Sequence, residues 1–183
     1  MRGAVGPGVV MRRASGGLDL EHPLIRRVLY AVTGLVALYV VWLALFYRYH
    51  FLDGVNLLIH EAGHVVFSPL GEVASVWGGT LLQLAFPLAF VVYFARRRQR
   101  VEAGLTAVWA AESLMYTAEY MGDAVRQELP LVGGHIHDWN YLLDRIGLLG
   151  AAEGLAALLH ILASLGAIVA VFTVFMELKN RSS

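Results

Sequence analysis

The chain has 183 residues, and its 58% apolar content, 15% charged content and mean hydropathy of +0.62 exclude an ordinary soluble domain, in which about a quarter of residues are charged. Its formal net charge of zero gives no reason to expect nucleic acid as a partner. Because the chain has no cysteine, disulfides, thiolate metal sites and a cysteine nucleophile are excluded, so any metal must be bound by His, Asp or Glu.

The hydropathy pattern divides the chain into one membrane-embedded helical domain, residues 26–178, and two cytoplasmic tails. The first tail, residues 1–25, is rich in glycine, lacks the apolar core of a signal peptide and is expected to be flexible. The second tail, residues 179–183, is short. We therefore predict an all-α integral membrane protein whose surroundings are the lipid bilayer.

Four apolar runs are candidates to cross the hydrocarbon core as helices: residues 28–46, 80–95, 103–121 and 155–176. Residues 55–68 form a shorter apolar segment, roughly 21 Å long as a helix, which predicts a re-entrant or buried helix rather than a span. Residues 71–79 and the polar stretch 122–145 are predicted to be loops.

Basic residues orient these helices, because cytoplasmic loops carry an excess of Lys and Arg. Arg26 and Arg27 precede the first span, four arginines lie within residues 96–100, and Lys179 follows the last span. Both termini are therefore predicted to be cytoplasmic, in a bacterial-type inner or plasma membrane. The 55–68 helix then enters and leaves from the outer side, where the 122–145 loop also lies.

The short helix contains the pentapeptide HEAGH at residues 60–64. Residues four apart share one helix face, so His60 and His64 can bind one zinc ion, while Glu61 is placed to act as a general base without being a ligand. The small spacers Ala62 and Gly63 allow another helix to come close. A chance match without a metal is the alternative, but polar groups among apolar flanks are costly in lipid without partners.

A catalytic zinc site of this kind needs a third protein ligand and one open position. The outer loop offers His137 as the preferred ligand, Asp138 as another ligand or as a partner that orients an imidazole, and His135 as a further possibility. The alternative is that Asp138 caps a helix beginning at Trp139 and that both histidines are solvated loop residues.

Three carboxylates, those of Glu112, Glu119 and Asp123, are spaced to share one face of the third span. They could accept hydrogen bonds from the zinc histidines, line a hydrophilic access path or conduct an ion. Asp123 is nearest the outer boundary and is the best candidate to support the zinc site, although it could instead pair with Arg126.

The HEAGH sequence, Gly78-Gly79 and the apolar stretch 80–90 with Pro87 together resemble the site-2 protease family of intramembrane zinc metallopeptidases, over residues 56–94. The resemblance implies that His60 and His64 are zinc ligands and that Glu61 is the catalytic base. That family takes its third ligand from an Asp-Gly motif on a later membrane segment. Here Asp53-Gly54 precedes HEAGH, and no such motif follows it.

These features predict a membrane-embedded zinc metallohydrolase with Glu61 as general base, whose zinc site faces the extracytoplasmic side. We expect a peptidase acting on membrane-protein or extracytoplasmic peptide substrates. Two alternatives remain open: a zinc hydrolase acting on a lipid-like substrate, and a non-enzymatic metal-binding or ion-conducting membrane protein whose function rests on the carboxylates of the third span.

Overall fold

A computed structural model describes residues 18, 20, 22–132 and 136–181. The regular structure of the described residues is entirely helical, which confirms the all-α prediction. The helices are α1 (Pro23–Phe46), α2 (Phe51–Phe67), α3 (Glu72–Arg96), α4 (Arg100–Gly122), α5 (Asp138–Arg145) and α6 (Ala152–Asn180), with single 3₁₀ turns η1 (Ser68–Leu70) and η2 (Leu149–Ala151).

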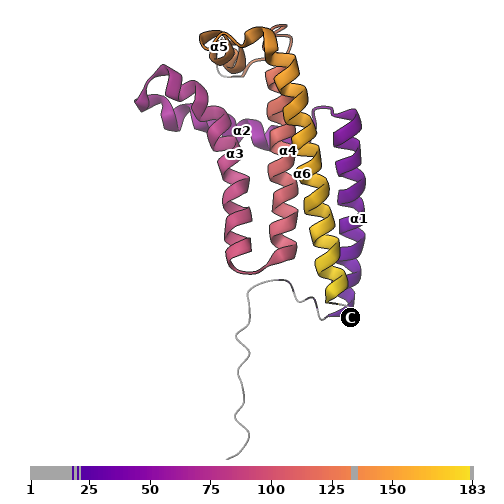
Figure 1. Ribbon diagram of the computed structural model, residues 1–183. Helices are drawn as coiled ribbons and strands as arrows, with labels where there is room; N and C mark the ends of the chain where they lie inside the picture. Colours follow the sequence, from indigo (N-terminus) through magenta and orange to yellow (C-terminus); the bar gives the residue numbers. More distant parts are fainter. Residues whose placement is uncertain (1–17, 19, 21, 133–135, 182–183) are drawn as a thin grey trace, which may run out of the picture.

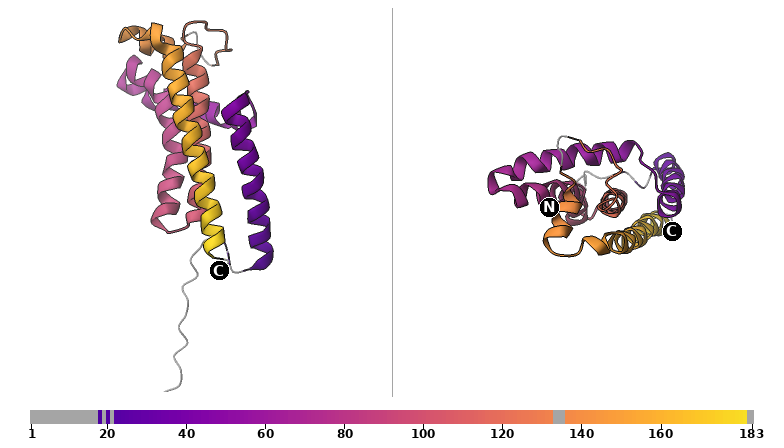
Figure 2. Two further views of the ribbon diagram at one scale, coloured as in Figure 1. Left: turned by 45° about the vertical axis from the view of Figure 1, so that its right-hand side comes forward. Right: turned by 90° about the horizontal axis from the view of Figure 1, so that it is seen from above.

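Four helices, α1, α3, α4 and α6, run along a common axis, and α2 lies across this bundle near one end (Figures 1 and 2). The short helix α5 covers the same end, whereas the turn between α3 and α4, the start of α1 and the end of α6 lie at the opposite end (Figure 1). Helix α4 packs against both α3 and α6, and α6 also packs against α1. Helix α4 is therefore the central element of the bundle.

Small residues explain the close packing of α4 on α6. A Cβ atom added to Gly104 of α4 would lie 2.3 Å from Cγ2 of Val174 on α6. The main core cluster likewise combines small side chains from both helices, such as Ala111 and Ala167, with Val40 and Leu43 of α1. Small residues at such positions let two helix backbones approach closely.

Three helices are long and apolar enough to cross a membrane: α1, α3 and the segment Leu149–Asn180, which contains α6. Their outer faces expose large apolar side chains, including Leu38 of α1 (69% exposed) and Phe172 of α6 (60% exposed). Soluble monomers rarely expose large continuous apolar patches. The described residues thus have the composition and surface of a membrane protein, with three such helices where the sequence predicted four spans.

Helix α2 is longer than predicted, because it begins at Phe51 instead of residue 55. The added turn is capped by the preceding residue: the backbone N–H of His50 donates to Asp53 Oδ2 at 2.7 Å. The helices also exceed the predicted domain limits of 26–178, since α1 begins at Pro23 and α6 continues to Asn180. Most of the predicted N-terminal tail, residues 1–17, lies outside the described residues.

The loop predicted for residues 71–79 is wrong, because α3 begins at Glu72 and includes Gly78 and Gly79. Glycine disfavours a helix by about 1 kcal/mol relative to alanine, and here tertiary packing overrides that preference. The backbones of α2 and α3 meet at these glycines: a Cβ atom on Gly63 would lie 2.2 Å from the carbonyl oxygen of Gly78. Only a pair of glycines allows this approach.

Candidate metal centre

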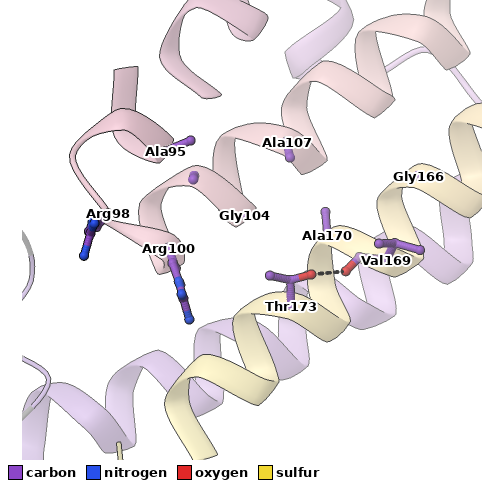
Figure 3. A pocket seen from close by; sticks show the side chains of 10 residues that line it. Ala95, Arg98, Arg100, Gly104, Ala107, Gly166, Val169, Ala170 and Thr173 are labelled. Carbon is purple, nitrogen blue, oxygen red and sulfur yellow. Dashed lines mark hydrogen bonds between the residues drawn. The ribbon is translucent and has the colours of Figure 1, made fainter. Parts of the chain in front are cut away.

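The described residues form a cavity at each end of the bundle. One, of about 750 Å³, is lined mainly by small residues of α4 and α6 and by Arg98 and Arg100, and Thr173 beside it donates to the carbonyl oxygen of Val169 (Figure 3). The other, of about 1010 Å³, lies between α2, α4, the end of α1 and the loop before α5. Its lining includes His60, Glu61, His64 and Asp138, so this second cavity contains the groups predicted for chemistry.

Helix α5 brings a loop residue to the HEAGH helix. The backbone N–H of Asp138 donates to the hydroxyl of Tyr120 on α4 at 3.1 Å, and the side chain of Asn140 donates to the carbonyl of Ala124 at 2.8 Å. The ring of Trp139 packs edge-on against Trp77 of α3, with centroids 5.7 Å apart. These contacts to two helices fix the position of Asp138, which is the first residue of α5.

Both HEAGH imidazoles point at the Asp138 carboxylate. His60 Nε2 lies 2.7 Å from Asp138 Oδ2, and His64 Nε2 lies 3.2 Å from the same oxygen. His60 and Asp138 are buried, being 3% and 4% exposed. One ligand atom from each of the three residues lies within 4.8 Å of the others, which is the separation expected of donors around a single metal ion.

The other nitrogen of each ring has its own partner. His60 Nδ1 lies 3.0 Å from Oε1 of Gln83, and His64 Nδ1 lies 2.9 Å from the carbonyl oxygen of Ser75. The Gln83 amide nitrogen donates to Ser113 and Thr117 of α4, so its oxygen must accept from His60. Metal-bound histidines show this arrangement, in which Nδ1–H donates to an oxygen and Nε2 faces the metal.

This geometry requires a positive charge among the three groups. When Nδ1 of a neutral ring carries the proton, the Nε2 lone pair faces the Asp138 carboxylate, so a proton or a metal cation must lie between them. Burial raises the pKa of Asp138, but hydrogen bonds from His60 and His64 outweigh it and hold the pKa below its ordinary value. The group is therefore a carboxylate at neutral pH. Two imidazole nitrogens and one carboxylate oxygen beside a cavity fit the donor set of a catalytic zinc ion.

Gly79 of α3 provides space beside these rings. A Cβ atom on Gly79 would lie 2.6 Å from His60 Nε2 and 2.8 Å from Cε1 of His64. Even an alanine there would have to displace the two imidazoles. Of the Gly78-Gly79 pair, Gly79 thus lies against the two imidazoles, while Gly78 and Gly63 set the distance between α2 and α3.

His137, the residue preferred as third ligand, is not grouped with the HEAGH histidines; Asp138, another candidate, is. His137 is the N-cap of α5, its Nδ1 accepting from the backbone N–H of Asn140 at 3.3 Å, and its Nε2 lies 3.4 Å from Asp123 Oδ2. Asp138, predicted as a possible cap, is instead the first helical residue and is free to face the cavity. His135 lies outside the described residues.

The three carboxylates predicted to share one face of the third span have separate surroundings. Glu112 is fully buried and accepts from Asn56 Nδ2 at 2.8 Å, whereas Glu119 is exposed to the cavity. Asp123 accepts from the backbone N–H groups of residues 128 and 129 and contacts His137, so it shapes the loop and does not touch the HEAGH histidines. Its predicted pairing with Arg126 is wrong, because Arg126 pairs with Glu153 at 3.5 Å.

The sequence prediction missed Gln83 and Ser75, the partners of the two imidazoles. Gln83 carried a usable signal, since it is an uncharged polar residue inside an otherwise apolar run, and such residues in membrane helices usually have a specific partner. Ser75 contributes a backbone carbonyl, for which no side-chain pattern exists.

Comparison of the chain with protein-family models, with curated proteins and with solved structures finds no match. The likeness to site-2 proteases therefore stays a resemblance in motif, carried by HEAGH, Gly78-Gly79 and Pro87.

Proposed function

We propose that the chain is a membrane-embedded zinc metallohydrolase, and specifically a peptidase. The observation that carries this proposal is the convergence of His60 Nε2 and His64 Nε2 on one carboxylate oxygen of Asp138, beside Glu61, in a cavity of about 1010 Å³. His60, His64 and Asp138 would hold the zinc ion, and the cavity would leave one position open for water or substrate.

Zinc in such a site polarises a substrate carbonyl and lowers the pKa of a water molecule. The Glu61 carboxylate, one residue from His60 and lining the same cavity, accepts the proton of the attacking water. The water oxygen bonds to the carbonyl carbon, the C–N bond breaks, and Glu61 returns the proton to the leaving amine. Gln83 and the Ser75 carbonyl keep the imidazoles oriented throughout.

The cavity walls favour an apolar, extended substrate. The end of α1 contributes Leu45 and Phe46, and the loop before α5 contributes Leu131, Val132 and Ile136. A peptide segment from a membrane-anchored or extracytoplasmic protein fits such walls. A lipid-like amphiphile shares the same apolar character, so a zinc hydrolase acting on an amphiphile is the second candidate.

The placement in the membrane is part of the proposal. Helix α4 is not apolar enough to be identified as a membrane span by its composition alone. However, α3 and α6 pack on it, and carboxylates within membrane spans usually face the bundle interior. With 23 residues it is about 35 Å long, enough for a fourth span. The arginine-rich α3–α4 turn, the start of α1 and the end of α6 lie at the same end of the bundle (Figure 1), which favours a cytoplasmic location for that end and an extracytoplasmic one for the zinc site.

Metal removal tests the proposal. We expect the purified full-length protein in detergent to hydrolyse a fluorescein-labelled casein probe, to lose this activity with 1,10-phenanthroline and to regain it when zinc is added, because the ligands act only around the metal. Hydrolysis of a fluorescent phospholipid but not of casein would favour the second candidate. Casein hydrolysis that survives complete zinc removal would contradict the zinc mechanism.

A further inference from the structure

A second cluster of potential metal ligands lies at the start of α2, apart from the HEAGH site. His50 is in the linker between α1 and α2, Asp53 is in the first turn of α2, and Glu112 is in the middle of α4. One ligand atom from each lies within 4.8 Å of the others. Asp53 and Glu112 are both 0% exposed, so this cluster is more deeply buried than the HEAGH site.

The imidazole of His50 lies between Asp53 and Glu112. Asp53 Oδ1 accepts from the Tyr47 hydroxyl at 2.5 Å, and Asp53 Oδ2 lies 2.6 Å from His50 Nδ1. His50 Nδ1 also lies 3.1 Å from the carbonyl oxygen of Arg48, so two acceptor oxygens face this nitrogen. His50 Nε2 forms a hydrogen bond with the hydroxyl of Tyr39 and lies 3.7 Å from Glu112 Oε1. The Arg48 carbonyl favours the tautomer with the proton on Nδ1, so Nε2 is the ring nitrogen that a metal would use, and Asp53 lies close enough to supply a ligand oxygen.

Glu112 presents one oxygen without a partner. Its Oε2 accepts from Asn56 Nδ2 at 2.8 Å, and Asn56 is itself held by the indole N–H of Trp109 at 3.0 Å. Its Oε1 is buried and has no hydrogen-bond partner among the described residues. An unpaired buried carboxylate oxygen is costly, and this one faces His50.

The charges of the cluster balance only when a cation or additional protons lie among its three groups. Asp53 and Glu112 contribute two buried carboxyl groups, and the ion-pair partner found for each among those residues is His50. Even a protonated His50 supplies a single positive charge. Two ionised carboxylates this close in a buried site repel each other strongly unless a cation or a proton lies between them.

We propose that His50, Asp53 and Glu112 form a second site for a divalent transition-metal ion, which fastens the start of α2 to α4. Imidazole and carboxylate donors suit ions such as zinc. Asp53 and His60 are seven residues apart on α2, roughly 10 Å along the helix axis, whereas the ions of two-metal catalytic sites are about 3.5–4 Å apart. The second ion is therefore structural, and it holds in place the helix that carries the catalytic groups.

Zinc stoichiometry tests the second site without reference to activity. The full-length protein in detergent is loaded with zinc, desalted and measured by inductively coupled plasma mass spectrometry. We expect about two zinc ions per chain in the wild type and about one in Glu112→Gln and in Asp53→Asn, because each variant removes a charged ligand with little change in shape. Glu102→Gln, on the same helix α4 but away from the cluster, should keep both ions.

The same measurement separates this proposal from the proposed function. The wild type could hold about one zinc ion that is unchanged in Glu112→Gln but lost in Asp138→Ala. This result would overturn the second site and leave the HEAGH site intact, and it would mean that Asp53 and Glu112 share a proton instead of a metal ion. If the wild type held about one zinc ion, and this ion were lost in Glu112→Gln but kept in Asp138→Ala, the result would support the second site and contradict zinc binding at the HEAGH site. Loss of both ions in Glu112→Gln would overturn the claim of two separate sites.

Discussion

Glu61→Gln should retain the zinc of the HEAGH site and lose about 10²–10⁴-fold in kcat on the casein probe, the range typical of a missing general base. Glutamine has nearly the shape of glutamate, and Glu61 is not among the grouped ligands His60, His64 and Asp138, so zinc binding is unaffected. An amide, however, cannot accept the proton of the attacking water. Steady-state kinetics and zinc analysis on the same preparation check both halves of the prediction.

The matched control is Glu153→Gln, which removes another carboxylate that is exposed and pairs with Arg126 near the start of α6. This variant should retain the kcat and zinc content of the wild type. If Glu61→Gln turned over casein as fast as the wild type, the general-base role would be disproved even with zinc in place. Loss of zinc in Glu61→Gln would instead mean that Glu61 is itself a ligand.

Gly79→Ala should weaken zinc binding at the HEAGH site by about 10–100-fold, as the loss of supporting groups around a metal typically does. The added methyl group would lie 2.6 Å from His60 Nε2, closer than real Cβ atoms approach other atoms, so the imidazoles or α3 must move. The substitution changes none of the proposed zinc ligands, so its effect tests only whether the two imidazoles lie against α3. Competition with a chromophoric zinc chelator measures the affinity.

Gly34→Ala on α1 is the control for Gly79→Ala, because no atom lies within 4 Å of the Cβ position at Gly34. It should keep wild-type affinity and be slightly more stable, since alanine favours a helix over glycine. Wild-type affinity in Gly79→Ala would show that the two imidazoles do not lie against α3 as described, and the account of the site would fail with it.

The helices were predictable because their signals are local. Apolar runs gave the positions of α1, α4 and α6, and the four-residue spacing of His60 and His64 placed both on one face of α2. Residues 72–79 were not predictable in this way. Their helical state depends on the contact of Gly63 with Gly78, a long-range packing term that local propensity does not contain.

The choice of the proposed third ligand shows a similar limit. His137 and Asp138 are adjacent in sequence. The prediction identified the segment that lies beside the HEAGH helix, because it placed both residues in the outer loop. Which of the two faces the site is decided by the start of α5, where His137 caps the helix and Asp138 begins it. The second cluster was missed for a related reason: Asp53 and Glu112 are far apart in sequence, and only the crossing of α2 against α4 brings them together.

The most direct test of the central claim compares the zinc content of purified wild-type protein with that of Asp138→Ala and His137→Ala. We expect Asp138→Ala to lose about one zinc ion per chain relative to the wild type, because it removes one of three protein ligands, whereas His137→Ala should keep the wild-type content. A wild-type protein without zinc would contradict the account, and so would an Asp138→Ala protein with undiminished zinc.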